Sequence, residues 1–126
     1  MKYLALFALL LPLFFVTGCG DSYDKIGADI LANAQAMRDT LKTVKDIPTA
    51  TSAAERIKSI NVEMQQVQVR LNKLGKPTKE EGDLLNTKYQ SQINDAKKAI
   101  DTERERIAAL GKEVSGPIDA AMSGGQ

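Results

Sequence analysis

One stretch of the sequence carries an uninterrupted heptad pattern. Its apolar residues alternate spacings of four and three positions, and they are Ala53, Ile57, Ile60, Met64, Val67, Leu71 and Leu74. This period places all of them on one stripe of an α-helix and favours left-handed packing against neighbouring helices. We therefore predict a helix over 53–74 at the centre of a helical bundle, with Ile60 and Leu71 largely buried.

Flanking residues predict where this central helix begins and ends. Ser52 and Glu55 have the spacing of a capping box, which closes the first turn of a helix with reciprocal hydrogen bonds. Gly75 is typical of the position that follows a helix. The segment 45–52 contains Pro48, and we expect it to form an exposed loop.

A second helical stretch precedes the central one and is predicted over 22–45. Tyr23, Ile30, Met37 and Val44 recur every seven residues, and Gly27, Ala34 and Leu41 occupy the seam positions between them. The repeat indicates a helix that packs along one face against the central helix.

A third helical stretch is predicted over 79–114. Thr78 and Glu81 form a second capping box at its start. Its apolar stripe comprises Leu85, Tyr89, Ile93, Ala96, Ile100, Ile107, Leu110 and Val114. Glu103 falls on the same stripe and interrupts it. Gly116 and Pro117 follow, so we expect the ordered chain to end there.

These stretches together predict an all-α fold, because alternating apolar patterns with turn signals are missing. Short connections favour an up-down-up three-helix, coiled-coil-like bundle with a longer third helix. The alternative is an extended helical hairpin that completes its core by oligomerising. The expected organisation is a signal peptide over 1–18, a tether over 19–21, the bundle over 22–116 and a flexible tail over 117–126.

The far end of the third helix is a candidate contact site. At a rise of ~1.5 Å per residue, a helix over 79–114 is ~54 Å long, against ~33 Å for the central helix. Ile107, Leu110 and Val114 would then project beyond the loop at Pro48, where a protein partner or a second copy could cover them. The alternative is that the chain bends at Gly111 and folds back over the bundle, or frays.

A second candidate contact is a stripe on the central helix. Val62 and Val69 lie seven residues apart, two positions beyond the seam residues Ile60 and Val67. In a three-helix bundle this face points outward. We therefore consider Val62 and Val69 as candidate partner contacts, against the alternative that two isolated surface valines need no explanation.

The N-terminus has the pattern of an export signal. Lys2 is followed by an uncharged segment over 3–16, which is shorter than the ~20 apolar residues of a membrane span. Val16, Thr17, Gly18 and Cys19 come next and resemble the lipobox of bacterial lipoproteins. An ordinary secretory leader followed by a chance cysteine is the alternative.

The resemblance implies that Cys19 becomes the N-terminal residue after cleavage and carries a diacylglycerol on its thiol and an acyl chain on its amine. Each buried methylene contributes ~0.8 kcal/mol, so two or three chains anchor a protein stably. Gly20 directly after the cysteine favours the outer membrane, facing the periplasm. Asp21 at the next position favours retention in the inner membrane in other bacteria.

A looser similarity concerns 53–110. The segments 74–78 and 103–107, together with Tyr89, are similar to small helical bacterial lipoproteins of unassigned function. This resemblance implies a helical envelope protein and brings no activity with it.

The sequence lacks the residues that several kinds of catalytic and metal site require. The chain has no histidine, no tryptophan and one cysteine, which the lipobox assigns to lipid. Histidine-dependent hydrolysis, thiol catalysis and His or Cys metal and haem sites are therefore excluded. After removal of 1–18, 16 basic side chains balance 16 acidic ones, so no basic surface attracts nucleic acid. Glu80, Glu81 and Asp83 are explained by the dipole of a helix start, and we predict no metal site.

The sequence therefore predicts a non-enzymatic envelope lipoprotein. Lipid on Cys19 is its expected contact with the membrane and its expected covalent group, with no other cofactor. A helical surface is expected to bind another protein or a second copy. The alternative function is an inhibitory or immunity-type lipoprotein that protects the envelope against a hydrolase or toxin through the exposed loop 45–52. An enzyme that uses only carboxylates, lysines and hydroxyls is the least favoured class.

Overall fold

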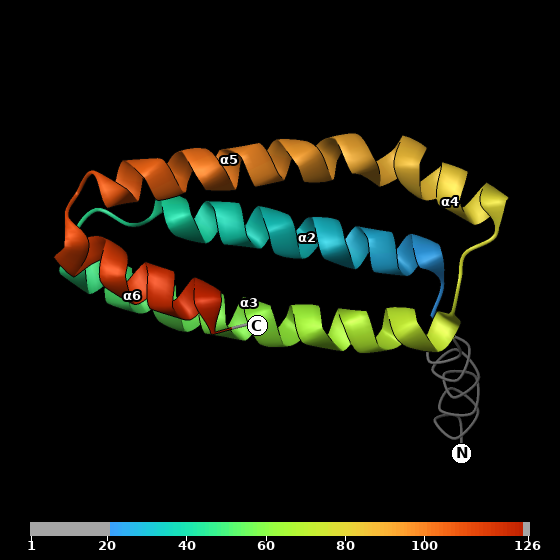
Figure 1. The fold of residues 1–126 in the computed structure, drawn as a ribbon, viewed down its shortest axis with the longest axis horizontal. Helices are drawn as coiled ribbons and strands as arrows, with labels where there is room; N and C mark the ends of the chain where they lie inside the picture. Colours follow the sequence, from blue (N-terminus) through green and yellow to red (C-terminus); the bar gives the residue numbers. More distant parts are fainter. Residues whose placement is uncertain (1–20, 125–126) are drawn as a thin grey trace, which may run out of the picture.

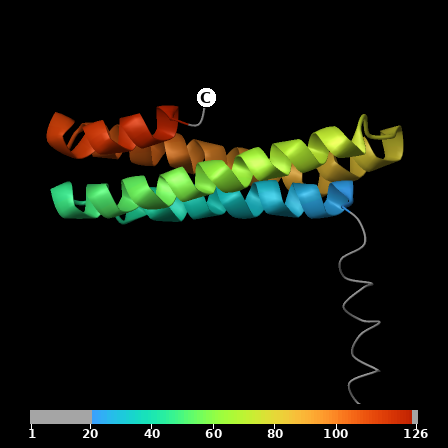
Figure 2. The same cartoon turned by 90° about the horizontal axis from the view of Figure 1, so that it is seen from below.

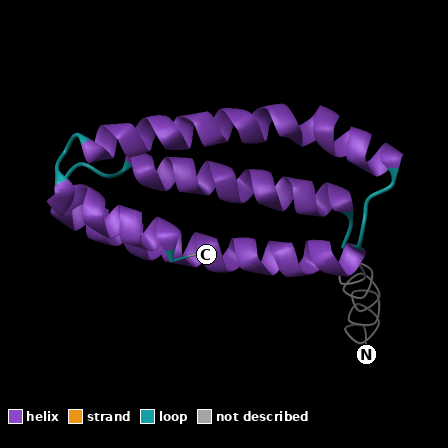
Figure 3. Ribbon diagram, viewed as in Figure 1, coloured by secondary structure: helices purple, strands orange, loops and turns teal. Residues whose placement is uncertain are grey.

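The computed structural model describes residues 21–124, and this part of the chain folds into helices with no strand (Figure 3). The predicted all-α class is confirmed. The elements in chain order are α2 (Tyr23–Lys42), α3 (Ile47–Leu74), α4 (Lys79–Leu85), the π-helical turn η1 (Asn86–Gln90), α5 (Ser91–Ala108) and α6 (Lys112–Ser123).

The helices run up and down along one long axis (Figure 1). α2 packs against α3 on one side and against α5 on the other, and α4, η1 and α5 follow one another as a single long helical pass. α6 then reverses direction and packs on α3. Figure 2 shows that, where α6 lies, α5 and α6 form one layer above α2 and α3. That half of the molecule is a four-helix bundle, and the other half is built from three helical passes.

The reversal at the end of α5 corrects the predicted third helix. The helical pass ends at Ala108 instead of continuing to about Val114, and the chain turns at Gly111, whose φ is 107°. Residues with a side chain rarely adopt this backbone conformation, which glycine tolerates. The three-helix bundle with an overhanging third helix is therefore wrong. The alternative forms instead: the chain bends at Gly111 and folds back over the bundle.

The segment expected to be a flexible tail differs from the prediction as well. Residues 117–123 are the later part of α6, and 125–126 lie outside the described residues. Pro117 lies inside this helix and gives up one backbone hydrogen bond. Ile118 and Ala121 are buried against the bundle, which stabilises the helix in spite of the proline.

The start of α3 corrects a second prediction. Asp46, rather than Ser52, caps the helix: its side chain accepts from the backbone N–H of Thr49, and Thr49 bonds back to the backbone N–H of Asp46, both at 3.0 Å. Pro48 lies in the first turn, where its missing N–H costs nothing. The expected exposed loop 45–52 is therefore mostly the first turns of α3, although most of its residues are exposed as predicted.

The core lies in the four-helix half and is rich in small side chains. Its fully buried members include Leu41, Val44, Ile57, Ile107 and Ile118, and α3 contributes Ala50, Ala53 and Ala54 between them. Ile60 is 1% exposed, as predicted, whereas Leu71 in the three-helix half is only partly buried. The predicted seam is thus most deeply buried where α6 adds a fourth helix.

Candidate functional site

Val16, Thr17, Gly18 and Cys19, which resemble a lipobox, lie outside the described residues. The first described residue is Asp21, and its side chain is already hydrogen-bonded to the bundle. Arg70 of α3 donates to the Asp21 carboxylate from Nε at 2.9 Å and from Nη2 at 2.6 Å. Its remaining nitrogen, Nη1, donates to Asp29 of α2 at 2.7 Å. One guanidinium therefore joins the first described residue, α2 and α3.

These hydrogen bonds also change the acidity of the groups involved. The hydrogen bond from Arg70 lowers the pKa of Asp21 below its ordinary value. The bonds to Asp21 and Asp29 raise the pKa of Arg70 further. Both groups thus stay charged at neutral pH, and the contact persists as an ion pair.

Two further hydrogen bonds fix the same region. The Tyr23 hydroxyl donates to the carbonyl of Gly75, directly after α3. Ser22 caps α2 by accepting from the backbone N–H of Lys25 at 3.2 Å. The start of α2 is consequently locked to the end of α3. We call this end of the molecule, residues 21–25 and 73–79, the Gly75 end.

A second feature is the outer face of α3. Val62 and Val69 are 53% and 54% exposed, and the structure places both on the surface, as the predicted stripe requires. Two hollows adjoin along this face. One, of about 260 Å³, is lined by Lys58, Asn61, Val62, Gln65, Ala120, Ala121 and Gly124. The other, of about 410 Å³, is lined by Val62, Gln65, Gln66, Val69 and Arg70.

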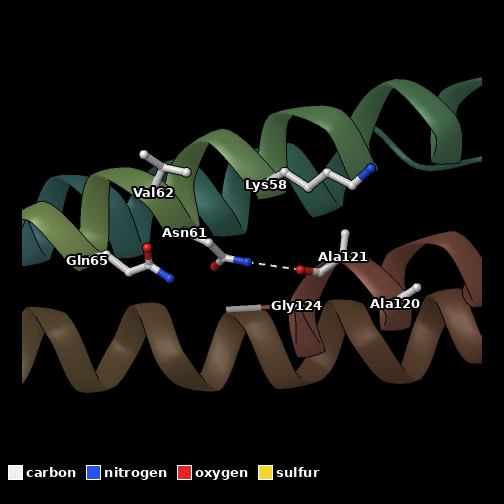
Figure 4. A pocket seen from close by; sticks show the side chains of 7 residues that line it. All are labelled: Lys58, Asn61, Val62, Gln65, Ala120, Ala121 and Gly124. Carbon is white, nitrogen blue, oxygen red and sulfur yellow. Dashed lines mark hydrogen bonds between the residues drawn. The ribbon is translucent and has the colours of Figure 1, made fainter. Parts of the chain in front are cut away.

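The first hollow opens where α6 ends (Figure 4). Asn61 Nδ2 donates to the carbonyl of Ala121 at 2.9 Å, while Val62 points away from α6. Beyond this point no part of residues 21–124 continues the line of α6 along α3, and Met64 of the seam is 36% exposed. The face combines aliphatic and amide side chains with the charged Lys58 and Arg70 at its ends, which suits contact with another protein.

The structure separates the residues that were predicted to form a third-helix tip. Ile107 and Val114 are 1% and 7% exposed and belong to the core with Leu41 and Ile118. Leu110 alone is exposed, at 43%, in the turn before Gly111. Ile107 of α5 and Val114 of α6 both face the core, so neither is presented on the surface of the described residues.

Arg106 is a residue that the sequence did not single out. Its Nη1 and Nη2 donate to the carbonyls of Val44 and Leu41 at 2.8 and 3.0 Å, and its Nε bonds to Glu103 at 2.6 Å. It caps the end of α2 by donating to the Val44 carbonyl and by adding a donor to the Leu41 carbonyl, which also accepts from the backbone N–H of Val44 at 3.2 Å. Glu103, which interrupts the predicted stripe, holds this guanidinium in place.

The acidic cluster at the start of α4 has a structural role in part. Thr78 caps α4 as predicted by accepting from the backbone N–H of Glu81 at 3.2 Å, but the Glu81 carboxylate accepts from the Thr78 hydroxyl at 3.1 Å instead of from its backbone N–H, so the predicted capping box forms only in part. Among residues 21–124, no three acidic, histidine or cysteine side chains come together in a group that could hold a metal ion. Within the same range, no helix has the length and apolar character needed to cross a bilayer.

Comparisons with known proteins add no relative. The chain matches no protein-family model, no curated protein sequence and no solved structure.

Proposed function

We propose that this protein is an extracytoplasmic lipoprotein, anchored through lipid on Cys19, whose helical bundle binds another protein and catalyses no reaction. The observation that carries the proposal is the Val16–Cys19 lipobox, which ends two residues before Asp21, the first residue held by the bundle. Gly20 favours the outer membrane, with the bundle in the periplasm.

The outer face of α3 supports the binding role. Its two hollows share Val62 and Gln65 and extend to Val69. The hollows continue along α3 from the point where α6 ends. A partner helix bound in them would therefore lie on α3 next to α6. The 61–74 segment of α3 spans about 20 Å, which accommodates an α-helix of three to four turns. We therefore propose an amphipathic helix of a partner protein as the occupant.

Intact mass measurement tests the anchor. The chain extracted from membranes is expected to begin at Cys19 and to carry the mass of a diacylglycerol and an acyl chain. Cys19→Ser is expected to leave the membrane fraction. A mature chain with a free thiol, or unchanged membrane retention of a cleaved Cys19→Ser variant, contradicts the proposal.

Co-purification with paired variants tests the binding face. Val62→Lys with Val69→Lys is expected to abolish recovery of a stoichiometric partner while helicity is retained. The matched control is Ile47→Lys with Leu84→Lys, because these side chains are each 48% exposed and lie elsewhere. The control is expected to retain the partner. Equal recovery with both pairs contradicts a role for this face.

A further inference from the structure

The hold on Asp21 makes the connection between lipid and bundle very short. Consecutive Cα atoms are 3.8 Å apart, so Asp21 lies at most about 7.6 Å from the Cα of Cys19. Arg70 fixes Asp21 by two hydrogen bonds, and Tyr23, two residues on, is fixed to Gly75. Gly20 is thus the single residue between the lipid-bearing position and the folded bundle.

This short connection brings one set of side chains to the membrane surface. Lys73, Lys76 and Lys79 lie exposed at the Gly75 end, and none of them forms an ion pair within residues 21–124. Lysine is a good point-charge ligand for phosphate. The reach of at most about 7.6 Å keeps Asp21 within about one Debye length, about 8 Å at physiological ionic strength, of the lipid-bearing residue, so charges close to Asp21 still act on the headgroups.

The acidic residues of the same end oppose this attraction only in part. Asp21 is paired with Arg70, and Asp24 is paired with Lys88 at 2.8 Å. Glu81 accepts a hydrogen bond from the neutral hydroxyl of Thr78 and keeps its charge. Glu80 and Asp83 also lie on α4 and are exposed. Lys73 acts directly on the Asp21 carboxylate from the last turn of α3, Lys76 lies in the following loop and Lys79 begins α4.

We infer that the Gly75 end docks on the phospholipid headgroups, with Lys73, Lys76 and Lys79 against their phosphates and with Arg70 acting as the clamp that holds the tether short. The inference rests on the proposed lipid anchor. It orients the bundle end-on to the membrane. At ~1.5 Å per residue, the 28 residues of α3 then carry its Asp46 end about 40 Å away, and the Val62–Val69 face points sideways.

Fluorescence quenching in vesicles measures this orientation. The lipidated full chain is reconstituted into vesicles of phosphatidylethanolamine and phosphatidylglycerol that contain a headgroup-nitroxide lipid. A dye on Pro77→Cys reports the Gly75 end, and a dye on Lys45→Cys reports the opposite end. Both positions are exposed. We expect quenching at 77 to exceed quenching at 45 several-fold.

Two pairs of variants test the clamp and the lysines. Asp21→Asn releases the tether and is expected to reduce quenching at 77, whereas Asp29→Asn removes the other ion pair of Arg70 and is expected to leave it unchanged. Lys73→Gln with Lys79→Gln is likewise expected to reduce it. The matched control is Lys42→Gln with Lys112→Gln, which changes two exposed lysines of the opposite end.

The outcomes separate this inference from the anchor on which it depends. Intact mass of the same preparation reports the lipid. Equal quenching at both positions in a lipidated chain would mean that the bundle lies flat on the membrane or does not touch it. This result contradicts the docking and leaves the lipid anchor supported. Unchanged quenching in both Asp21→Asn and the Lys73–Lys79 pair also overturns the docking. A chain without lipid overturns both proposals.

Discussion

The ring of Tyr89 lies directly on the backbone of Gly27. A Cβ added at Gly27 would come within 2.5 Å of Cδ2 of Tyr89 and within 2.8 Å of the Leu85 side chain. The ring has little freedom to move away, because the Tyr89 hydroxyl donates to Asp24 at 2.8 Å. The π-helical turn η1 includes Tyr89, so this contact joins α2 to the third helical pass.

Gly27→Ala is therefore expected to destabilise the fold. Alanine favours a helix over glycine by about 1 kcal/mol, but overpacking a close contact costs about 1–3 kcal/mol. We expect a net decrease in the free energy of unfolding, measured by urea denaturation. Gly82→Ala is the control, because nothing lies within 4 Å of its added Cβ and only the helix preference remains. An unfolding free energy at or above that of the wild type contradicts the close contact.

Removal of the Arg106 guanidinium is expected to loosen the end of α2. Arg106→Met removes the side-chain donor of the Val44 carbonyl and one of the donors of the Leu41 carbonyl, and a hydrogen bond from a charged group contributes about 1.5–3 kcal/mol. Since this side chain is 40% exposed, we expect the lower part of that range.

The control for this variant is Arg104→Met. Arg104 contacts Asp119 at 3.9 Å on the surface, and exposed pairs of this kind contribute about 0–1 kcal/mol. Equal losses in the two variants, measured by thermal or urea unfolding, would show that the cap on α2 contributes nothing specific.

The helical class and several helix ends could be predicted from local signals. Gly75 ends α3 and Thr78 caps α4, because each acts on its own turn of chain. The same local signals left the reversal at Gly111 as one of two alternatives. Ile107, Leu110 and Val114 keep a helical spacing across this glycine, and only burial of α6 on α3 favours the fold-back. Periodicity records which residues are apolar, but not which helix covers them.

The part of the candidate site that lies on a single helix could be predicted from the sequence. Val62 and Val69 share a face of α3, so their exposure followed from the seam beside them. The hold of Arg70 on Asp21 joins residues 49 positions apart. An arginine and an aspartate at that separation carry no local signal, and their meeting depends on how α2 and α3 align in the folded bundle.

Charged substitutions near the turn between α5 and α6 test the fold directly. Ile107→Lys places a charge in the core between α2, α5 and α6, and we expect loss of the cooperative unfolding transition. Leu110→Lys, at 43% exposure, is expected to change the free energy of unfolding by less than about 0.5 kcal/mol. Circular dichroism during thermal unfolding measures both. Equal stability of the two variants contradicts the return of α6 over Ile107.

Acid is expected to weaken the contact between α2 and the third helical pass. Hydrogen bonds from Lys88 and Tyr89 lower the pKa of Asp24 below its ordinary value of 3.8. A carboxyl whose pKa is lower in the folded chain stabilises the fold above its unfolded-state pKa. That contribution is complete at neutral pH and is lost as the pH falls below about 3.8 and through the folded-state pKa.

Asp24→Asn isolates this contribution. The variant is expected to be less stable than the wild type at neutral pH, and the difference in unfolding free energy is expected to shrink as the pH falls below about 3.8, because the protonated wild-type carboxyl also lacks a charge. Asp83→Asn is the control, since Asp83 is exposed and forms no ion pair within residues 21–124. Urea denaturation across this pH range measures both variants. A difference between wild type and Asp24→Asn that stays constant with pH would show that the charge of Asp24 does not stabilise the packing of Tyr89 on Gly27.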